Sequence, residues 1–185
     1  MSKGHLFVIS GASGVGKSTV LEKVMEQRKD LLFSVSATTR APREGEVDGR
    51  DYYFITREQF ADMIERGEFL EYDEHHKTFY GTPAQEVLRK QEEGNVVLDV
   101  EPNGAFNVRA CRPDATLIFI NPPSWEALES RLRGRGDTSE EQVTIRLNRA
   151  KWEMEQAKKY DYVVVNDQVE ICVENILKII AEKAD

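Results

Sequence analysis

Five short runs of apolar and β-branched residues recur along the chain, with longer mixed segments between them. The runs cover residues 6–10, 33–37, 96–100, 116–120 and 162–166. Runs of this length and composition are typical of strands that are buried on both faces of a sheet. Most of the segments between them have the apolar spacing of amphipathic helices. The alternation predicts an α/β fold with a doubly wound, five-stranded parallel sheet.

The interval between the second and third runs is too long for a single connecting helix. Within it, segments 51–54, 68–72 and 78–80 have the composition of short antiparallel strands. Thr56 and Gln59 predict a capping box at the start of a helix that ends near Gly67. The sequence therefore predicts one domain, with a core of residues 1–37 and 95–185 and an inserted small α+β subdomain at about 38–94.

A glycine-rich motif follows the first run and precedes a helical segment. Residues 11–18 match the pattern G-x-x-x-x-G-K-[ST] of a P-loop, in the strand-loop-helix context that this motif requires. In such loops, backbone N–H groups surround phosphate oxygens, Lys17 would bring a positive charge to the β and γ phosphates, and Ser18 would offer a hydroxyl to Mg²⁺. The predicted ATP-binding residues here are Gly11, Ala12, Ser13, Gly14, Val15, Gly16, Lys17, Ser18 and Thr19.

A second set of basic residues follows the second run. Ser36 leads into Arg40, Arg43 and Arg50, with no lysine among them. Arginine binds phosphate oxygens two at a time, so this loop predicts a second phosphate site, although a solvated basic turn has the same composition. Asp99 lies next to the end of the third run, in the manner of the carboxylate that holds magnesium in P-loop proteins; its alternative role is to cap a helix.

Five further arginines cluster between the fourth and fifth runs, around Gly134 and Gly136. They are Arg131, Arg133, Arg135, Arg146 and Arg149. Hinge glycines and concentrated positive charge predict a lid at about 131–149 that closes over the transferring phosphoryl group. Some of the five could instead form salt bridges on a surface helix. A P-loop and a second phosphate site together predict transfer from a nucleoside triphosphate to a phosphorylated acceptor.

Composition narrows the choice of partners. The chain has 25 Lys and Arg against 33 Asp and Glu, and this net charge of −8 argues against a nucleic-acid partner. The two cysteines, Cys111 and Cys172, form no metal-binding pair, and no apolar run is long enough for a membrane span or a signal peptide. We expect a cytoplasmic protein without a membrane partner, either a monomer or a homo-oligomer.

Taken together, these motifs closely resemble the guanylate kinase family along nearly the whole chain. The residues that carry the resemblance are at positions 11–18, 36–43, 45–52, 68–72, 80–82, 131–136 and 165–167. The resemblance implies transfer of the γ-phosphoryl group of Mg-ATP to GMP, and to dGMP, giving ADP and GDP in purine nucleotide metabolism. It also implies that the inserted subdomain binds GMP and that Mg²⁺ is required.

The resemblance assigns roles to individual residues. The residues that would hold GMP are Ser36, Arg40, Arg43, Tyr52, Glu71, Tyr80, Thr82 and Glu101. Among them, Glu71 and Glu101 would face the N1–H and the N2 amino group of guanine, donors that adenine lacks at that edge. Phosphoryl transfer would depend on Lys17, Arg40, Arg135, Arg146 and Asp99. Ser18 and Asp99 would hold the metal, and Asn166 would lie near the ATP base.

The chain departs from the family pattern in two places. Residues 77–79 are Lys-Thr-Phe where the family commonly has Gly-Asn-Tyr before the matching tyrosine, and Pro102 and Asn103 stand where a variable residue and glutamine are usual. Three alternatives stay open on the sequence alone. These are a guanylate-kinase-like interaction domain without activity, a P-loop GTPase, and a kinase for a phosphorylated sugar. The intact P-loop, the lack of an Asn-Lys-x-Asp motif, and the pair Glu71 and Glu101 argue against them in turn.

Overall fold

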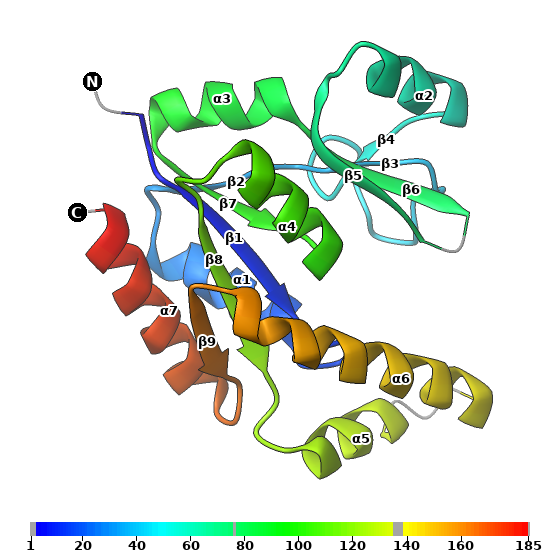
Figure 1. The fold of residues 1–185 in the computed structure, drawn as a ribbon, viewed down its shortest axis with the longest axis vertical. Helices are drawn as coiled ribbons and strands as arrows, with labels where there is room; N and C mark the ends of the chain where they lie inside the picture. Colours follow the sequence, from blue (N-terminus) through cyan, green and yellow to red (C-terminus); the bar gives the residue numbers. More distant parts are fainter. Residues whose placement is uncertain (1–2, 76, 135–138, 185) are drawn as a thin grey trace.

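A five-stranded parallel sheet forms the centre of the protein. The computed structural model describes residues 3–75, 77–134 and 139–184. The strands lie in the order β2-β7-β1-β8-β9, and every neighbouring pair is parallel (Figure 1). Their bounds are β1 (Leu6–Gly11), β2 (Leu31–Phe33), β7 (Asn95–Asp99), β8 (Thr116–Asn121) and β9 (Tyr162–Val165). The predicted α/β fold with a five-stranded parallel sheet is confirmed.

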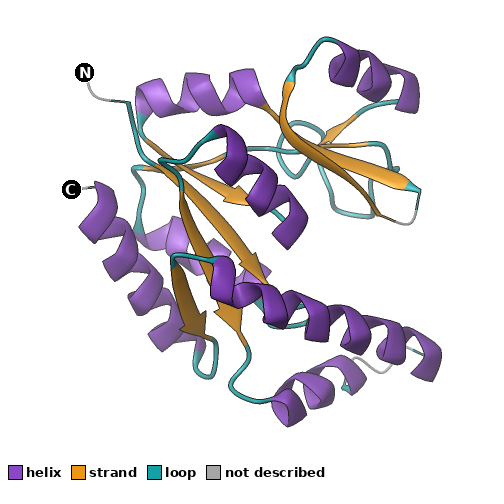
Figure 2. Ribbon diagram, in the orientation of Figure 1, coloured by secondary structure: helices purple, strands orange, loops and turns teal. Residues whose placement is uncertain are grey.

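Helices cover both faces of this sheet (Figure 2). In β1, Phe7 and Ile9 contribute to the apolar core on one face, whereas Leu6 and Val8 contribute to the core on the other. This follows from the alternation of side chains along a strand. The first core is closed by α1 (Lys17–Gln27), α5 (Trp125–Arg133), α6 (Glu140–Gln156) and α7 (Val169–Ala184). The second core is closed by α3 (Ala84–Glu93), α4 (Pro102–Cys111) and the 3₁₀ turn η1 (Ala157–Lys159).

A second, smaller sheet lies at one corner of the molecule, beside α2 (Arg57–Glu65). Its strand order is β4-β3-β6-β5, with bounds β3 (Ala37–Thr38), β4 (Tyr53–Phe54), β5 (Phe69–His75) and β6 (Thr78–Pro83). β5 pairs with β6 in antiparallel fashion, as predicted for segments 68–72 and 78–80, and β3 also pairs with β6 in antiparallel fashion. The expectation that segment 51–54 is antiparallel was wrong, because β4 pairs with β3 in parallel.

The apolar run at 33–37 was predicted as one strand and is in fact divided between the two sheets. Phe33 ends β2, and the Ser34 amide still donates to the carbonyl of Val97, 3.1 Å away. The chain then leaves the main sheet, and Ala37 begins β3 in the small one. Serines at positions 34 and 36 interrupt the apolar pattern where the chain crosses from one sheet to the other. The loop after β2 therefore lies beside the small sheet.

The small sheet has an aromatic core of its own. Phe60 of α2 stacks on Phe69 of β5 with ring centroids 4.4 Å apart, and it also contacts Tyr72 and Phe79. The predicted capping box of α2 is present, and Gly67 follows the helix with a φ of 65°. In the parts of the chain that the structure describes, no helix has the length and apolar character to cross a membrane.

Candidate active site

The P-loop connects the end of β1 to the start of α1. Gly14 and Gly16 have φ angles of 83° and 89°, which glycine adopts at no steric cost. A Cβ atom at Gly14 would also lie 2.5 Å from Cδ2 of Leu132, so α5 packs directly against the loop. The loop lines a cavity of about 310 Å³. The predicted residues that line it are Gly11, Ala12, Ser13, Gly14, Val15, Gly16, Lys17, Ser18 and Thr19, together with Arg146.

Two residues support the P-loop from outside the cavity. Nδ2 of Asn166 donates to the carbonyl of Val15 at 2.8 Å, and Nη1 of Arg131 donates to the same carbonyl at 3.3 Å. Nη2 of Arg131 also donates to the backbone carbonyl of Asn166 at 3.1 Å. Asn166 is only 3% exposed. The structure thus places Asn166 against the P-loop backbone. The sequence had instead predicted a position near the ATP base.

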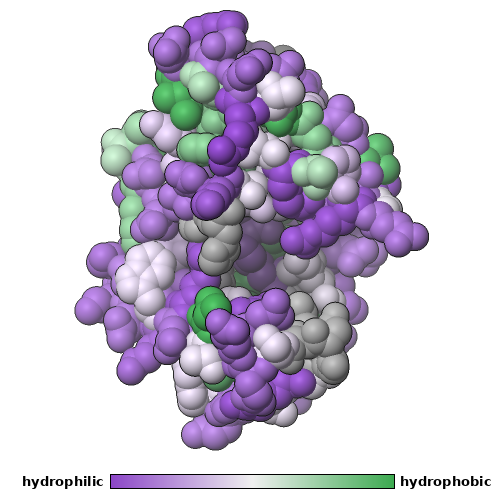
Figure 3. All heavy atoms as spheres, turned by 90° about the vertical axis from the view of Figure 1, so that its right-hand side faces the viewer, coloured by the Kyte–Doolittle hydropathy of each residue, from purple (hydrophilic) through white to green (hydrophobic). Residues whose placement is uncertain are grey.

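A larger cavity of about 600 Å³ adjoins the P-loop and extends toward the small sheet. On the side of the molecule shown in Figure 3, mainly hydrophilic residues surround a hollow between the upper and lower halves. The predicted site residues that line this cavity are Ser13, Lys17, Ser36, Arg40, Arg43, Tyr52, Glu71, Tyr80, Asp99, Glu101 and Arg146. The ends of β1, β2 and β7 and the small sheet therefore converge on one site, as expected for the carboxyl edge of a parallel sheet.

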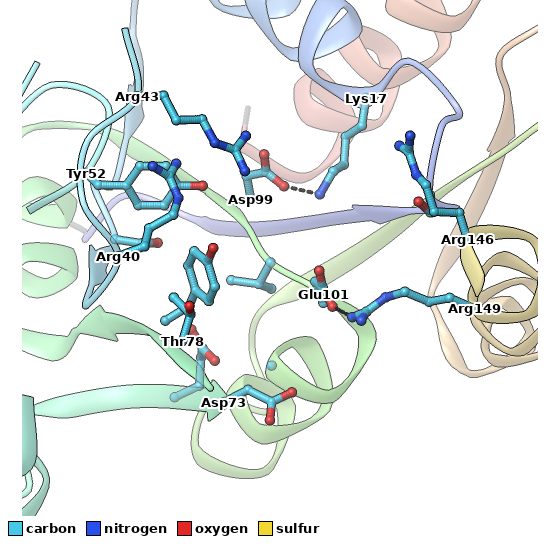
Figure 4. A pocket seen from close by; sticks show the side chains of 16 residues that line it. Lys17, Arg40, Arg43, Tyr52, Asp73, Thr78, Asp99, Glu101, Arg146 and Arg149 are labelled. Carbon is cyan, nitrogen blue, oxygen red and sulfur yellow. Dashed lines mark hydrogen bonds and ion pairs between the residues drawn. The ribbon is translucent and has the colours of Figure 1, made fainter. Parts of the chain in front are cut away.

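Lys17 and Asp99 form an ion pair in the middle of the site (Figure 4). Lys17 is the first residue of α1 and Asp99 is the last residue of β7, so the pair joins the P-loop to the neighbouring strand. Both side chains stay partly accessible, at 21% and 28%. A phosphate group that enters the site can therefore draw Lys17 away from Asp99 at modest cost.

Arg40 is held in a fixed orientation at the far side of the cavity. Its two terminal nitrogens each donate to a carboxylate oxygen of Glu46 at 2.7 Å, and its guanidinium lies 5.0 Å from the ring centroid of Tyr52. The backbone N–H of Arg43 donates to Glu46 as well. Because these donors stabilise the anion, the pKa of Glu46 is lowered to about 2. The carboxylate thus organises the loop that carries both arginines.

Glu71 is a carboxylate buried at the base of the same cavity. It is 7% exposed, and Oε1 accepts a hydrogen bond from the Thr82 hydroxyl at 2.6 Å. Burial, with a smaller contribution from the charge of Asp73, raises the pKa of Glu71 to about 7. Thr82 was predicted to contact GMP, and the structure shows it fully buried behind Glu71. Its direct partner is therefore the carboxylate.

The absence of a side chain at Gly104 makes room for Glu71. A Cβ atom at this position would lie 2.7 Å from Oε2 of Glu71. Because the family resemblance implies that Glu71 faces guanine, we expect Gly104→Ala to displace the carboxylate and to raise the KM for GMP by about tenfold, which corresponds to most of one charged hydrogen bond. The KM for ATP should change little. Steady-state kinetics would measure both, with Asn107→Ala at an exposed position of α4 as the control. A GMP KM equal to that of the control would contradict this role for Gly104.

The predicted lid arginines separate into distinct groups. Arg146 and Arg149, both on α6, line the two cavities. Arg133 forms surface ion pairs with Glu129 and Glu140, the alternative that the sequence had left open. Arg131 supports the P-loop, as described above. Arg135 lies outside the residues that the structure describes.

Glu101 lines the larger cavity, but its carboxylate forms an ion pair with Arg149 of α6 (Figure 4). It occupies the N-cap position of α4, and Pro102 begins the helix as the sequence predicted. Glu101 was predicted to face guanine beside Glu71. In this structure the two carboxylates have different partners, Thr82 for Glu71 and Arg149 for Glu101.

Several residues in or beside these two cavities, which together form the cleft, were not assigned a role from the sequence. Asp73 and Thr78 line the larger cavity. Asp73 lies two residues after Glu71 in β5, so the period-two spacing of a strand would have placed both side chains on one face. Asn103, to which no contact had been assigned, donates from Nδ2 to Oδ2 of Asp73 at 3.4 Å and joins α4 to β5. Glu153 of α6 lines the P-loop cavity, and a glutamate in the buried stripe of a helix is the signal that could have identified it.

Comparison with known proteins identifies the family. A family model described as guanylate kinase matches residues 3–183. A guanylate kinase of Halalkalibacterium halodurans is 49% identical over 96% of this chain and 88% of the relative, and one of Trichormus variabilis is 48% identical over 95% and 88%. A crystal structure of guanylate kinase from Anaplasma phagocytophilum aligns with a TM-score of 0.80 and 34% identity, over 99% of this chain and 87% of that one. The chain belongs to the guanylate kinase family.

Proposed function

We propose that this protein binds ATP at the P-loop and GMP against the small sheet, and transfers the γ-phosphoryl group between them. The overall reaction is that of a guanylate kinase, in which ATP and GMP become ADP and GDP. One observation supports this assignment of the two sites. The P-loop and the loop of Arg40 and Arg43 face each other across the 600 Å³ cavity, with Lys17 and Asp99 between them.

On the acceptor side, the phosphate of GMP would contact Arg40 and the side chains around it. The residues proposed to hold it are Ser36, Arg40, Arg43, Tyr52 and Tyr80. Glu71 would accept hydrogen bonds from the guanine edge, with Thr82 orienting its carboxylate. Glu101 would join Glu71 at the base once its pair with Arg149 opens. We therefore propose residues 38–94 as the GMP-binding insertion.

The chemistry needs no strong general base, because the attacking group is already a phosphate oxyanion. Catalysis then depends on in-line positioning and on neutralising the charge of the transferring group. We propose that Lys17, Arg40 and Arg146 supply this positive charge, with Arg135 as a further lid arginine. Asn166 would act on ATP through the P-loop backbone at Val15. Closure of the lid at 131–149 would exclude water and prevent hydrolysis.

Magnesium fits the donor set of this site. Mg²⁺ is usually held by one or two protein oxygens together with substrate phosphates and water. The described residues contain no group of three or more His, Cys, Asp or Glu that could hold a metal without such help. The hydroxyl of Ser18 and the carboxylate of Asp99 would hold the ion when ATP brings it. The bound ion would neutralise charge on the β and γ phosphates.

We place the enzyme in purine nucleotide metabolism in the cytoplasm, with GMP and dGMP as acceptors. An assay of ADP release tests the assignment directly, with Mg-ATP against GMP, dGMP, AMP, UMP and CMP and with an acceptor-free control. Turnover confined to GMP and dGMP would support the proposal. A folded protein that is silent with every acceptor would favour the interaction-domain alternative or the kinase for a phosphorylated sugar.

Arg43→Ala tests the identity of the arginine loop. We expect the KM for GMP to rise about 10- to 100-fold, since a charge-assisted phosphate contact contributes roughly 1.5–3 kcal/mol. The KM for ATP should stay near that of the wild type. Arg66→Ala, an exposed arginine at the end of α2, is the matched control. If only the ATP parameters changed, the loop would have been assigned to the wrong nucleotide.

A further inference from the structure

Glu153 is a buried carboxylate with two specific partners in the donor half of the cleft. It is 3% exposed and lies on the inner face of α6, together with Val143 and Ala150. Its Oε2 accepts a hydrogen bond from the backbone N–H of Ser13 at 2.7 Å. Its Oε1 accepts one from Nε of Arg149 at 3.0 Å, one helical turn away. Both oxygens are therefore occupied, as the burial of a charged group requires.

The donor at Ser13 is part of the loop that binds phosphate. Backbone N–H groups of such loops point toward anions. Glu153 takes the amide of Ser13, and this bond fixes the first turn of the P-loop to α6. The Glu153 carboxylate thus accepts from a P-loop amide at the edge of the proposed ATP site.

The connection continues from Glu153 to the acceptor half of the cleft. Arg149 forms an ion pair with Glu101, which directly precedes α4. Ser13 and Arg149 line both the 310 Å³ and the 600 Å³ cavities, whereas Glu153 lines only the smaller one. Arg149 therefore lies where the two cavities meet, which is where a phosphoryl group would pass from one nucleotide to the other.

We propose that Glu153 is a positioning residue for phosphoryl transfer, which fastens α6 to the P-loop and orients Arg149 at the junction of the two cavities. The inference rests on the proposed function of the cleft. When substrates bind, Arg149 exchanges Glu101 for the transferring phosphoryl group, while its Nε stays on Glu153. Glu101 is then released toward the acceptor.

A carboxylate is needed here because it offers two acceptor oxygens, whereas a glutamine offers one. In Glu153→Gln, the side-chain oxygen can accept from only one of the two donors, Ser13 or Arg149. The side-chain NH₂ group then faces the other donor, so one of the two hydrogen bonds is lost. The variant keeps the shape of the side chain and removes a buried charge. We therefore expect it to fold, and to place Arg149 less accurately.

The experiment compares the wild type, Glu153→Gln and the control Glu155→Gln, an exposed position on the same helix. Thermal unfolding and steady-state kinetics with Mg-ATP and GMP are measured for each. We expect Glu153→Gln to lower kcat about 10- to 100-fold, as small misplacement of a catalytic group does. Its KM for GMP should stay within about threefold of the wild-type value, because Glu153 does not line the 600 Å³ cavity in which GMP is proposed to bind.

A double-variant cycle makes the test independent of folding effects. If Glu153 acts through Arg149, then Arg149→Met should lower kcat by a similar factor, and the combined variant should be no slower than the slower single variant. Two outcomes would overturn the inference about Glu153 and leave the proposed function standing. One is that the losses in kcat of the two single variants add in the combined variant. The other is an unchanged kcat in Glu153→Gln while the wild type is active on GMP. A wild type that fails to phosphorylate GMP would overturn the proposed function instead. If Glu153→Gln does not fold, an unchanged kcat in Arg149→Met overturns the inference.

Discussion

Replacement of Lys17 by alanine is expected to lower kcat by about 10²- to 10³-fold, the loss typical of a preorganised donor that stabilises charge in a transition state. Lys17 is the one P-loop side chain that carries a positive charge, and it lies between the two cavities at the first residue of α1. An alanine leaves the backbone cradle intact, so ATP should still bind. The deficit should therefore lie in kcat and only secondarily in KM.

Folding of the Lys17→Ala variant should be little affected. Its partner Asp99 is 28% exposed, so the loss of the ion pair costs ~1 kcal/mol or less. Thermal unfolding without ligand measures this, and isothermal titration with ADP measures nucleotide binding. Lys23→Ala on the same helix, which removes a surface ion pair with Glu170, is the control. A Lys17→Ala variant with wild-type turnover would remove Lys17 from the chemistry.

The sequence predicted those features whose information is local. The P-loop between β1 and α1 follows from eight consecutive residues in a strand-loop-helix context, and the capping box of α2 follows from Thr56 and Gln59 alone. The order of apolar runs likewise predicts a doubly wound sheet. The P-loop and the capping box are each determined by residues that are neighbours in the chain, and each apolar run is recognised from its own few residues, so no long-range contact had to be known.

The features that sequence analysis missed depend on contacts between distant segments. The run at 33–37 is divided because Ser34 pairs with β7 while Ala37 pairs with β6, and local composition does not distinguish these partners. Arg131 and Arg149 have similar settings in the sequence, yet one supports the P-loop from behind and the other enters the cleft. Their roles depend on which face of a helix packs inward.

Substitution of Glu71 by glutamine is expected to reduce the selectivity of the enzyme for GMP over AMP by about 100-fold in kcat/KM. Guanine presents two donors that a carboxylate satisfies, whereas a glutamine amide places its own N–H₂ against one of them, and a site that leaves polar groups unpaired discriminates strongly. ATP parameters should be nearly unchanged. An unaltered ratio of kcat/KM for the two acceptors would contradict the assignment of Glu71 to the base.

The same substitution should change how GMP binding depends on pH. The pKa of Glu71 is raised to about 7 by burial, so the free wild-type enzyme carries a neutral Glu71 below that pH. If guanine is bound by the anion, the wild-type affinity for GMP should weaken as pH falls from 8 to 6. Glu71→Gln has no such group. Because the phosphate of GMP titrates equally in both experiments, the ratio of the two dissociation constants isolates Glu71.

As pH rises, the stability of the free wild-type enzyme should fall, whereas its affinity for GMP should increase. Since the folded pKa of Glu71 lies above its usual value of 4.5, the folded state holds this proton more tightly than the unfolded state does. The stabilising contribution is therefore complete below about pH 4.5 and is lost as pH rises through 7, a difference of ~3 kcal/mol for this shift. Glu71→Gln stays neutral, so it should unfold at higher urea concentration than the wild type at pH 8 and at nearly the same concentration at pH 5.

Urea unfolding of both proteins at pH 5 and pH 8, with Glu74→Gln as an exposed control on the same strand, tests this coupling. If the stability gap between wild type and Glu71→Gln widens with pH while GMP selectivity is lost, then the buried carboxylate is kept at a cost to the free enzyme because guanine needs it. A gap independent of pH would mean that the Thr82 hydrogen bond already compensates the buried charge. In that case the position would be stabilised by the fold itself, and the ligand would not be needed to explain why a glutamate is buried there.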